Sequence, residues 1–186
     1  MKMFRLLIVM TIICGIIYPL LVTVVGTVAF PEKANGSLID KEGKTLGSSL
    51  IAQKFSRGDF FHSRPSAADF ATVSSGASQS SPLQKSGKEL RDERRAALPQ
   101  GGVDAWTNSG SGLDPHISPE TALAQLPRIA NQRGISIEKL KDLIDSHTEG
   151  PTLGIWGQPR VNVLELNIAL MNVGNNGHSG STSRNP

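Results

Sequence analysis

The most apolar stretch of the chain, Leu6–Phe30, contains no charged residue. A helix of these 25 residues rises about 1.5 Å per residue and is long enough to cross the roughly 30 Å hydrocarbon core of a membrane. Gly15, Pro19 and Gly26 interrupt the apolar pattern. Such residues are tolerated in a membrane helix where neighbouring helices cover the loosened backbone. The pattern predicts one transmembrane helix that follows a short leader, residues 1–5.

A cleaved signal peptide is the alternative interpretation, with Thr27-Val28-Ala29 as the cleavage site. The apolar core of a signal peptide usually spans about 7 to 15 residues, so this run is too long and we expect an uncleaved anchor. Two basic residues precede the helix, Lys2 and Arg5, and three lysines follow it: Lys33, Lys41 and Lys44. This count does not favour a cytoplasmic N-terminus, but a short basic leader is the usual start of a signal anchor. We expect the N-terminus in the cytoplasm and the large domain outside it.

Short apolar patches follow the anchor. Leu38-Ile39 and Leu50-Ile51 flank the polar segment 40–44, which predicts a β-hairpin within residues 36–55. The Ser-rich segment 74–81 is expected to be a loop. Eight of the eleven residues in 85–95 are charged, so a helix there would present a largely solvated face, and we assign it no binding role.

Three helices are predicted in the C-terminal half. The first begins after Ser118, kinks at Pro127 and ends at Gly134, and the second begins after Ser136. The third begins after Asn162, which forms a capping-box pattern with Glu165. Apolar residues recur at helical spacing in each: Ala122, Leu126, Ile129 and Ala130; Ile137, Leu140, Leu143 and Ile144, with His147 at the edge; Leu166, Ile168, Leu170 and Met171.

Short strands beside packed helices predict a single α+β domain over residues 31–173. The Gly-, Ser- and Asn-rich segment 174–186 is expected to be a disordered tail.

Charge and cysteine content exclude several classes of protein. The chain has 19 Lys and Arg against 16 Asp and Glu, and without Lys2 and Arg5 the balance is 17 against 16. A nearly neutral domain is not typical of nucleic-acid binding, so no nucleic-acid partner is expected. Cys14 is the single cysteine and lies in the apolar run, which excludes a disulfide framework and a Cys-based zinc site.

Familiar catalytic patterns are incomplete. Gly43-Lys44-Thr45 ends like a phosphate-binding loop, but Leu38 stands where that loop needs a glycine. Segment 109–112 lacks the Gly-x-Ser-x-Gly spacing of a nucleophile elbow. The four histidines are isolated: His62, His116, His147 and His178. We therefore expect no catalytic residue and no metal site.

The segment Ser109–Ser118 leaves two interpretations open. Its hydroxyls, backbone amides, Asp114 and His116 lead into a helix start, where an anion could bind. In the other interpretation, which we favour, Asp114-Pro115 forms a turn and Ser118 caps the helix.

Several blocks along the chain resemble one family, the C subunits of bacterial Kdp potassium-transporting P-type ATPases. The blocks occur in the family's order behind one membrane helix, up to about Met171: Asn35 to Ile39, Gly47-Ser48 with Leu50-Ile51, Phe61 to Ala67, Ser109 to Asp114, and Gly157 to Asn167. Two residues depart from the family pattern, Phe70 in place of Tyr and Gln79 in place of Asn.

The resemblance implies a non-catalytic, single-pass subunit in the cell inner membrane. Its partners would be a channel-like K⁺-translocating subunit, a P-type ATPase subunit and the lipid bilayer, and its role would be assembly and coupling. Residues in the family blocks would serve structure or coupling: Arg64, Ser66, Ser111, Asp114, Asn162 and Glu165. No covalently bound cofactor is expected.

The family is also proposed to act as a catalytic chaperone that raises the ATP affinity of the pump subunit through a glutamine. Gln125 and Gln158 both match family positions. An exported domain does not meet cytoplasmic ATP, so this role conflicts with the expected topology, which we favour. A second function class is a free-standing membrane-anchored binding protein or enzyme that uses the Ser109–Ser118 loop.

Overall fold

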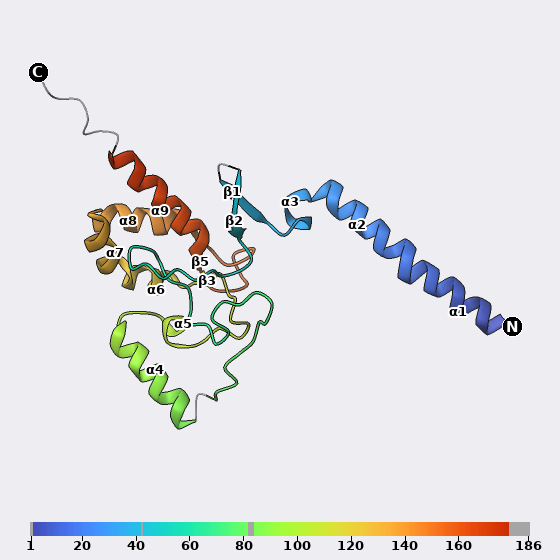
Figure 1. The fold of residues 1–186 in the computed structure, drawn as a ribbon, viewed down its shortest axis with the longest axis horizontal. Coiled ribbons are helices and arrows are strands. Elements are labelled where there is room, and N and C mark those ends of the chain that lie inside the picture. The colour runs from blue at the N-terminus through green and yellow to red at the C-terminus, as the bar shows by residue number, and fades with distance from the viewer. Residues whose placement is uncertain (1, 42, 82–83, 179–186) are drawn as a thin grey trace, which may run out of the picture. The chain divides into compact units, whose positions relative to one another are not determined.

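The computed structural model describes residues 2–41, 43–81 and 84–178, and its elements are shown in Figure 1. The chain divides into two compact units, Met1–Ser48 and Ser49–Pro186. The hairpin therefore groups with the N-terminal helix, whereas the sequence predicts it within the domain over 31–173.

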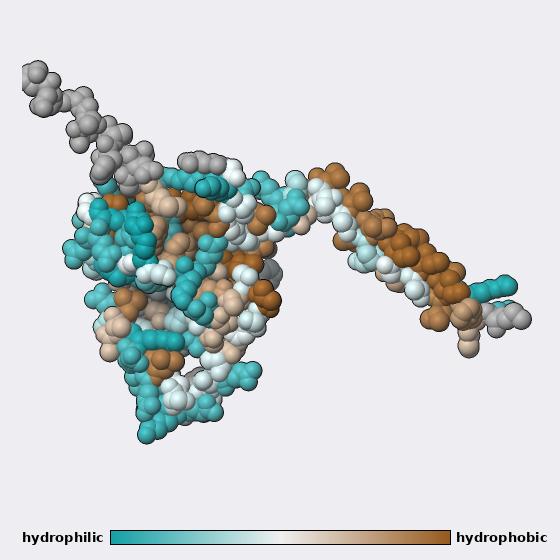
Figure 2. Space-filling model, in the orientation of Figure 1, coloured by the Kyte–Doolittle hydropathy of each residue, from teal (hydrophilic) through white to brown (hydrophobic). Residues whose placement is uncertain are grey.

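The N-terminal helix runs without a break over Lys2–Ala29, which is 28 residues. Its most apolar 18-residue window has a mean hydropathy of 2.6, and none of that window is buried within the protein. It comprises α1 (Lys2–Ile12), the π-helical turn η1 (Ile13–Ile17) and α2 (Tyr18–Ala29). Figure 2 shows its brown, apolar surface. The helix starts four residues before the predicted Leu6 and is apolar and long enough to span a membrane.

The π-helical turn ends at Ile17, two residues before Pro19. Proline has no N–H to donate to Gly15 O, and its ring would clash with that carbonyl in a regular α-helix. A wider turn relieves this clash without ending the helix. Threonine hydroxyls within the helix donate to carbonyls one turn earlier, Thr11 to Leu7 O and Thr23 to Pro19 O, both at 2.8 Å.

The predicted hairpin forms, but its second strand is not where the sequence analysis placed it. After the short helix α3 (Pro31–Ala34), β1 (Leu38–Lys41) pairs antiparallel with β2 (Lys44–Ser48). The apolar pair at 50–51 lies beyond the strand, in a turn. The Thr45 hydroxyl donates to Asp40 Oδ1 at 2.6 Å, so a polar side-chain pair, absent from the hydrophobic pattern, helps to set the register.

The second unit is α+β, as predicted. Its antiparallel sheet has the order β3-β5-β4, with strands His116–Ile117, Arg160–Asn162 and Thr148–Glu149. The helices are α4 (Lys85–Ala97), α5 (Val103–Trp106), α6 (Pro119–Ala124), α7 (Leu126–Arg133), α8 (Ile137–Ser146) and α9 (Val163–His178).

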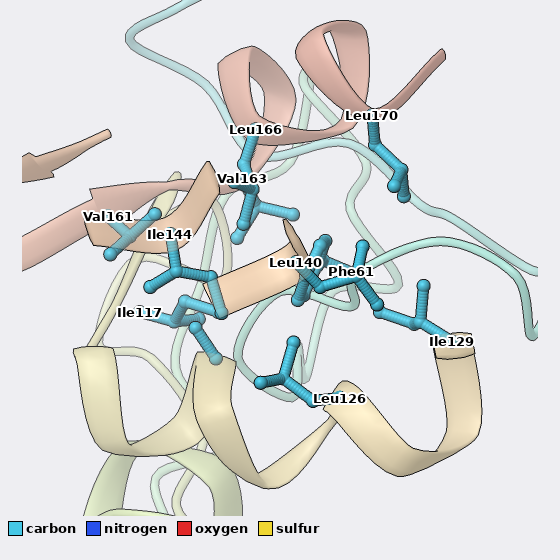
Figure 3. Packing of buried hydrophobic residues seen from close by; sticks show 11 residues of the cluster. Phe61, Ile117, Leu126, Ile129, Leu140, Ile144, Val161, Val163, Leu166 and Leu170 are labelled. Atoms are coloured by element: carbon cyan, nitrogen blue, oxygen red, sulfur yellow. The ribbon is translucent and has the colours of Figure 1, made fainter. Parts of the chain in front are cut away.

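The hydrophobic core lies among β3, β5 and helices α6 to α9. Phe61, from a loop, is fully buried and lies between side chains of α7 and α9 in Figure 3. The other members of the cluster are Ile117, Ala122, Leu126, Ile129, Leu140, Ile144, Val161, Val163, Leu166 and Leu170. Ile137, expected on the apolar stripe of its helix, is instead 48% exposed.

Helix boundaries follow the predicted caps. The Ser118 hydroxyl accepts from Thr121 N, and Asn162 Oδ1 accepts from Leu164 N and Glu165 N. The predicted kink is a full break, because Pro127 cannot donate to the carbonyl of Leu123 and the chain divides into α6 and α7.

Of two further predicted helix ends, the one at Gly134 is confirmed and the one at 173 is wrong. Gly134 ends α7 in the left-handed conformation, with φ of 65°. Helix α9 continues to His178, beyond the expected end at 173, and the rest of the predicted tail, 179–186, lies outside the described residues.

Candidate functional site

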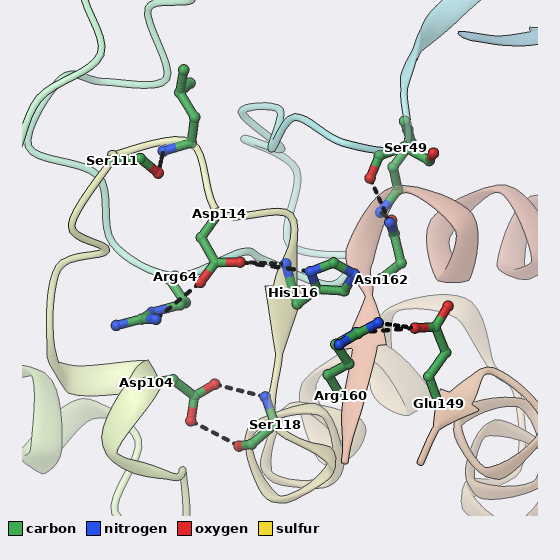
Figure 4. A network of polar contacts seen from close by, with 12 residues as sticks. Ser49, Arg64, Asp104, Ser111, Asp114, His116, Ser118, Glu149, Arg160 and Asn162 are labelled. Carbon is green, nitrogen blue, oxygen red and sulfur yellow. Dashed lines mark hydrogen bonds and ion pairs between the residues drawn. The ribbon is translucent and has the colours of Figure 1, made fainter. Parts of the chain in front are cut away.

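An ion pair joins two of the family blocks. Arg64 Nη1 donates to Asp114 Oδ2 at 2.9 Å, and Asp114 Oδ1 accepts from the backbone N of His116 at 3.0 Å (Figure 4). Burial alone would raise the pKa of Asp114, but hydrogen bonds from His116 and Arg64 hold it below its ordinary value. The carboxylate is therefore ionised at neutral pH and ties two loops together.

The geometry of the 109–118 segment supports the turn interpretation over an anion loop. Asp114 closes the turn, and Ser118 caps α6 while its hydroxyl donates to Asp104 Oδ1 at 2.7 Å. Asp104 Oδ2 also accepts from Ser118 N at 2.8 Å. The start of this six-residue helix is thus already occupied by a carboxylate of the chain itself.

Gln125 lies at the junction of α6 and α7 and is 5% exposed. Its Oε1 accepts from His62 N at 2.8 Å, and its Nε2 donates to His62 O at 3.1 Å. Arg128 Nη2 donates to the same Oε1 at 2.8 Å. The amide of Gln125 therefore fixes the loop backbone beside Phe61, and a ligand would have to compete with these bonds.

A cavity of about 990 Å³ lies beside the hydrogen-bonded pair of Gln125 and His62. Its wall comes from the loops around Phe61, from α4 and the segment after it, and from α6 and α7. Four cationic residues line it, Lys54, Arg64, Arg94 and Arg128, together with apolar side chains such as Phe55 and Leu98. Within the described parts of the chain, no Asp or Glu lines the cavity.

The four cationic side chains differ in whether they form an ion pair with a carboxylate. Lys54 pairs with Asp69 at 2.7 Å and Arg64 with Asp114. Among the residues that the structure describes, Arg94 and Arg128 form no ion pair and donate to neutral oxygens instead, including Asn108 Oδ1 and Phe60 O.

Burial lowers the pKa of the Arg94 and Arg128 guanidinium groups. Arg64 Nε and Ser63 Oγ, in the same wall, are buried without a hydrogen-bond partner in the described chain. The cavity thus has positive charge and donors that an anion could use.

Among the other predicted site residues, Ser66, Ser111 and Asn162 make hydrogen bonds that hold local structure. Ser66 Oγ accepts from Ala68 N and Phe70 N, and Ser111 Oγ accepts from Leu113 N. Asn162 donates from its Nδ2 to Ser49 O at 2.7 Å and caps α9. The side chains of Glu165 and Gln158 are exposed, and Gln158 is not among the residues that line the cavity.

Sequence reasoning missed Arg94, Arg128 and Asn167. Arg94 lies on the helix that was assigned no binding role, because its composition indicated only a solvated face. Asn167 is fully buried and bonds Phe61. A signal for Asn167 existed, since it is a polar residue on a helix whose neighbours Leu166 and Ile168 are apolar.

Several known proteins are similar to this chain over most of its length. A family model described as "K+-transporting ATPase, c chain" matches residues 1–172. The potassium-transporting ATPase KdpC subunit of Pseudomonas aeruginosa is 48% identical over 170 residues, which cover 88% of this chain and 91% of the relative. That of Dechloromonas aromatica is 46% identical over 179 residues, 90% and 94% of the two chains. That of Gloeobacter violaceus is 45% identical over 163 residues, 84% and 87%.

Proposed function

Because the chain belongs to the KdpC family of K⁺-transporting ATPase subunits, we propose that it is the membrane-anchored accessory subunit that supports assembly and coupling of its complex. Its partners in this proposal are a channel-like subunit that conducts K⁺ and a P-type subunit that hydrolyses ATP. The observation that carries the proposal is similarity over nearly the whole chain, anchor and domain together.

The structure supports this role in two ways. The N-terminal helix is long and apolar enough to remain in a membrane. The polar residues Arg64, Asp114 and Asn162 of the family blocks hold loops together and cap a helix. For the topology we propose a cytoplasmic N-terminus and a domain outside the cytoplasm, in the cell inner membrane.

Copurification tests the proposal. The full chain carries an affinity tag and is purified in mild detergent from membranes of potassium-starved cells. We expect the K⁺-conducting and ATP-hydrolysing subunits to accompany it, and a tagged variant that lacks residues 2–29 serves as the control. Recovery of the full chain alone, under conditions in which those subunits are present in the membrane, would contradict the proposal.

The cavity supports a second candidate role, ATP binding that raises the ATP affinity of the pump subunit. A triphosphate would meet Arg94 and Arg128, which form no ion pair in the described chain and feel only the more distant charges of Glu93 and Asp59. In this role Gln125 positions the loop, while Gln158, outside the cavity, takes no part.

Cellular ATP is cytoplasmic, so an extracytoplasmic domain does not bind it. A measurement of the domain's topology therefore tests both the proposed topology and the second role. Protease added to intact spheroplasts should digest the domain and leave the N-terminus protected. Full protection of the domain would overturn the proposed topology. ATP titrated onto the full chain in detergent would then test the second role. Arg94→Gln and Arg128→Gln are expected to weaken binding, and Arg91→Gln, on α4 but outside the cavity lining, to leave it unchanged.

A further inference from the structure

Strands β4 and β5 are the arms of a hairpin whose connection, residues 150–159, we call the tongue. The base is held by the strand pairing of Glu149 with Arg160 and by their ion pair, Nη2 to Oε2 at 2.8 Å (Figure 4). Nearer the tip, Thr152 and Trp156 exchange two backbone hydrogen bonds, at 2.7 and 3.1 Å. The tongue is therefore an ordered projection with a defined shape.

The tip presents three large apolar side chains to solvent. Leu153 is 80% exposed, Ile155 77% and Trp156 65%. No residue in 150–159 is charged, and the Glu149–Arg160 pair neutralises the base. Clustered exposed apolar residues on an otherwise polar domain mark an interaction site, and Trp is prominent among residues that dominate binding.

The backbone of the tip is strained in a way that fixes this presentation. Leu153 has φ of 55°, a left-handed conformation that is unfavourable for a residue with a branched side chain. Gly154 and Gly157, with φ of 73° and 94°, complete the turn. Such strain persists where a particular conformation is needed, and a preformed shape lowers the entropic cost of binding.

We propose that the tongue docks into an apolar pocket on another subunit of the same K⁺-transporting ATPase, which rests on the proposed function. Three side chains cover on the order of 400 Å², about half of the roughly 800 Å² that each partner contributes to a stable interface. The partner must therefore already be held beside this chain by other contacts. A fluid bilayer does not select a fixed backbone shape, and the neutral tongue lacks the basic residues that favour a lipid surface.

Photo-crosslinking in intact membranes tests the docking directly. The crosslinking amino acid p-benzoylphenylalanine replaces Trp156 in the full chain, coexpressed with the other subunits, and in a matched variant it replaces Val73, an apolar loop residue that is 99% exposed. We expect a protein adduct from position 156 to one other ATPase subunit and none from position 73. Adducts to lipid alone, or no protein adduct from 156 while the complex copurifies, would overturn the docking and leave the accessory role intact.

Substitution gives an independent readout. The double variant Leu153→Ser with Trp156→Ser should lower the amount of copurified partner subunits about tenfold, whereas Val73→Ser should leave it unchanged. Wild-type recovery with the double variant would also overturn the docking. If the double variant melts at a lower temperature than the native chain, a loss of partner subunits could reflect unfolding. The crosslinking result then decides whether the tongue docks. Absence of partner subunits from the native chain would instead overturn the proposed function, and the docking with it.

Discussion

Asn167 on α9 and Phe61, in the segment between β2 and α4, exchange two hydrogen bonds although they lie 106 positions apart in the chain. Phe61 N donates to Asn167 Oδ1 at 2.8 Å, and Asn167 Nδ2 donates to Phe61 O at 2.9 Å. Gln125 makes the equivalent pair with the next residue, His62. The side-chain amides of Asn167 and Gln125 thus pair with the backbone N–H and C=O groups of Phe61 and His62, as a neighbouring strand would. Phe61 is therefore buried in the core with both of its backbone groups hydrogen-bonded.

Asn167→Ala should lower the free energy of unfolding by about 2 to 4 kcal/mol, because it leaves the N–H and C=O of Phe61 buried and unpaired. Thermal and denaturant unfolding of the full chain in detergent, followed by circular dichroism, measures the change. Asn131→Ala, at an exposed position of α7, is the matched control and should change stability by less than about 0.5 kcal/mol. Equal stability of the two variants would show that the hydrogen bonds between Asn167 and Phe61 contribute nothing to the free energy of unfolding.

Asp114→Ala should lower the free energy of unfolding by about 1 to 3 kcal/mol, since Arg64 loses its carboxylate and His116 N its acceptor. The pKa of Asp114 is below its ordinary value of 3.8, so its contribution is present above that pH and is lost as pH falls through the folded-state pKa. Comparison with Asp114→Asn from pH 7 to 2.5 measures this, and the gap between the two curves should close at the acidic end.

The same mutant separates a structural role of Asp114 from one in coupling. If Asp114 acts in coupling alone, the mutant melts as the native chain does while the K⁺-dependent ATPase activity of the complex falls. A mutant that is normal in both measurements would remove Asp114 from either account.

His62 should make stability depend on pH near neutrality. Burial lowers its pKa below 6.5, and the positive charge of Arg128 acts in the same direction, against the hydrogen bond to Arg57 O. The unfolded chain therefore binds more protons than the folded one, and the free energy of unfolding falls as pH drops below 6.5 toward the folded-state pKa. His62→Gln should flatten the stability curve between pH 7 and 5, as measured by denaturant unfolding of the full chain at each pH.

Gly15→Leu with Gly26→Leu should leave the anchor inserted but reduce copurification of the partner subunits. Small residues allow membrane helices to approach closely. Among the described residues, nothing beyond the adjacent turns of the helix lies within 4 Å of the position that a Cβ would take at either glycine. Carbonate-resistant membrane association and affinity copurification measure the two properties. Val22→Leu with Val25→Leu is the control, and equal recovery from both double variants would count against helix packing at the glycines.

Local chemistry explains what the sequence predicts well. Ser118, Ser136, Asn162 and Gly134 mark helix ends because a cap depends on three or four neighbouring residues. The membrane helix is equally local, since its length and apolarity are read directly from the chain. The second hairpin strand was misplaced because its pairing depends on a polar contact, Thr45 to Asp40, and not on an apolar run.

Contacts between distant residues explain what the sequence does not predict. The Arg64–Asp114 pair joins residues 50 positions apart, and the family blocks identified both residues without indicating that they meet. Arg94 belongs by composition to a solvated helix, yet folding places it in the wall of the cavity with Arg128. Composition describes the average of a helix, whereas burial is decided side chain by side chain.

The K⁺-stimulated ATPase activity of the complex, purified with and without this chain, tests the accessory role most directly. We predict that the isolated chain hydrolyses no ATP, and that the remaining subunits purified without it have lost most of their K⁺-stimulated turnover. Adding back the full chain should restore the activity, whereas the chain without residues 2–29 should not. Full K⁺-stimulated activity in the absence of this chain, or turnover by the chain alone that persists through successive purification steps, would contradict the account.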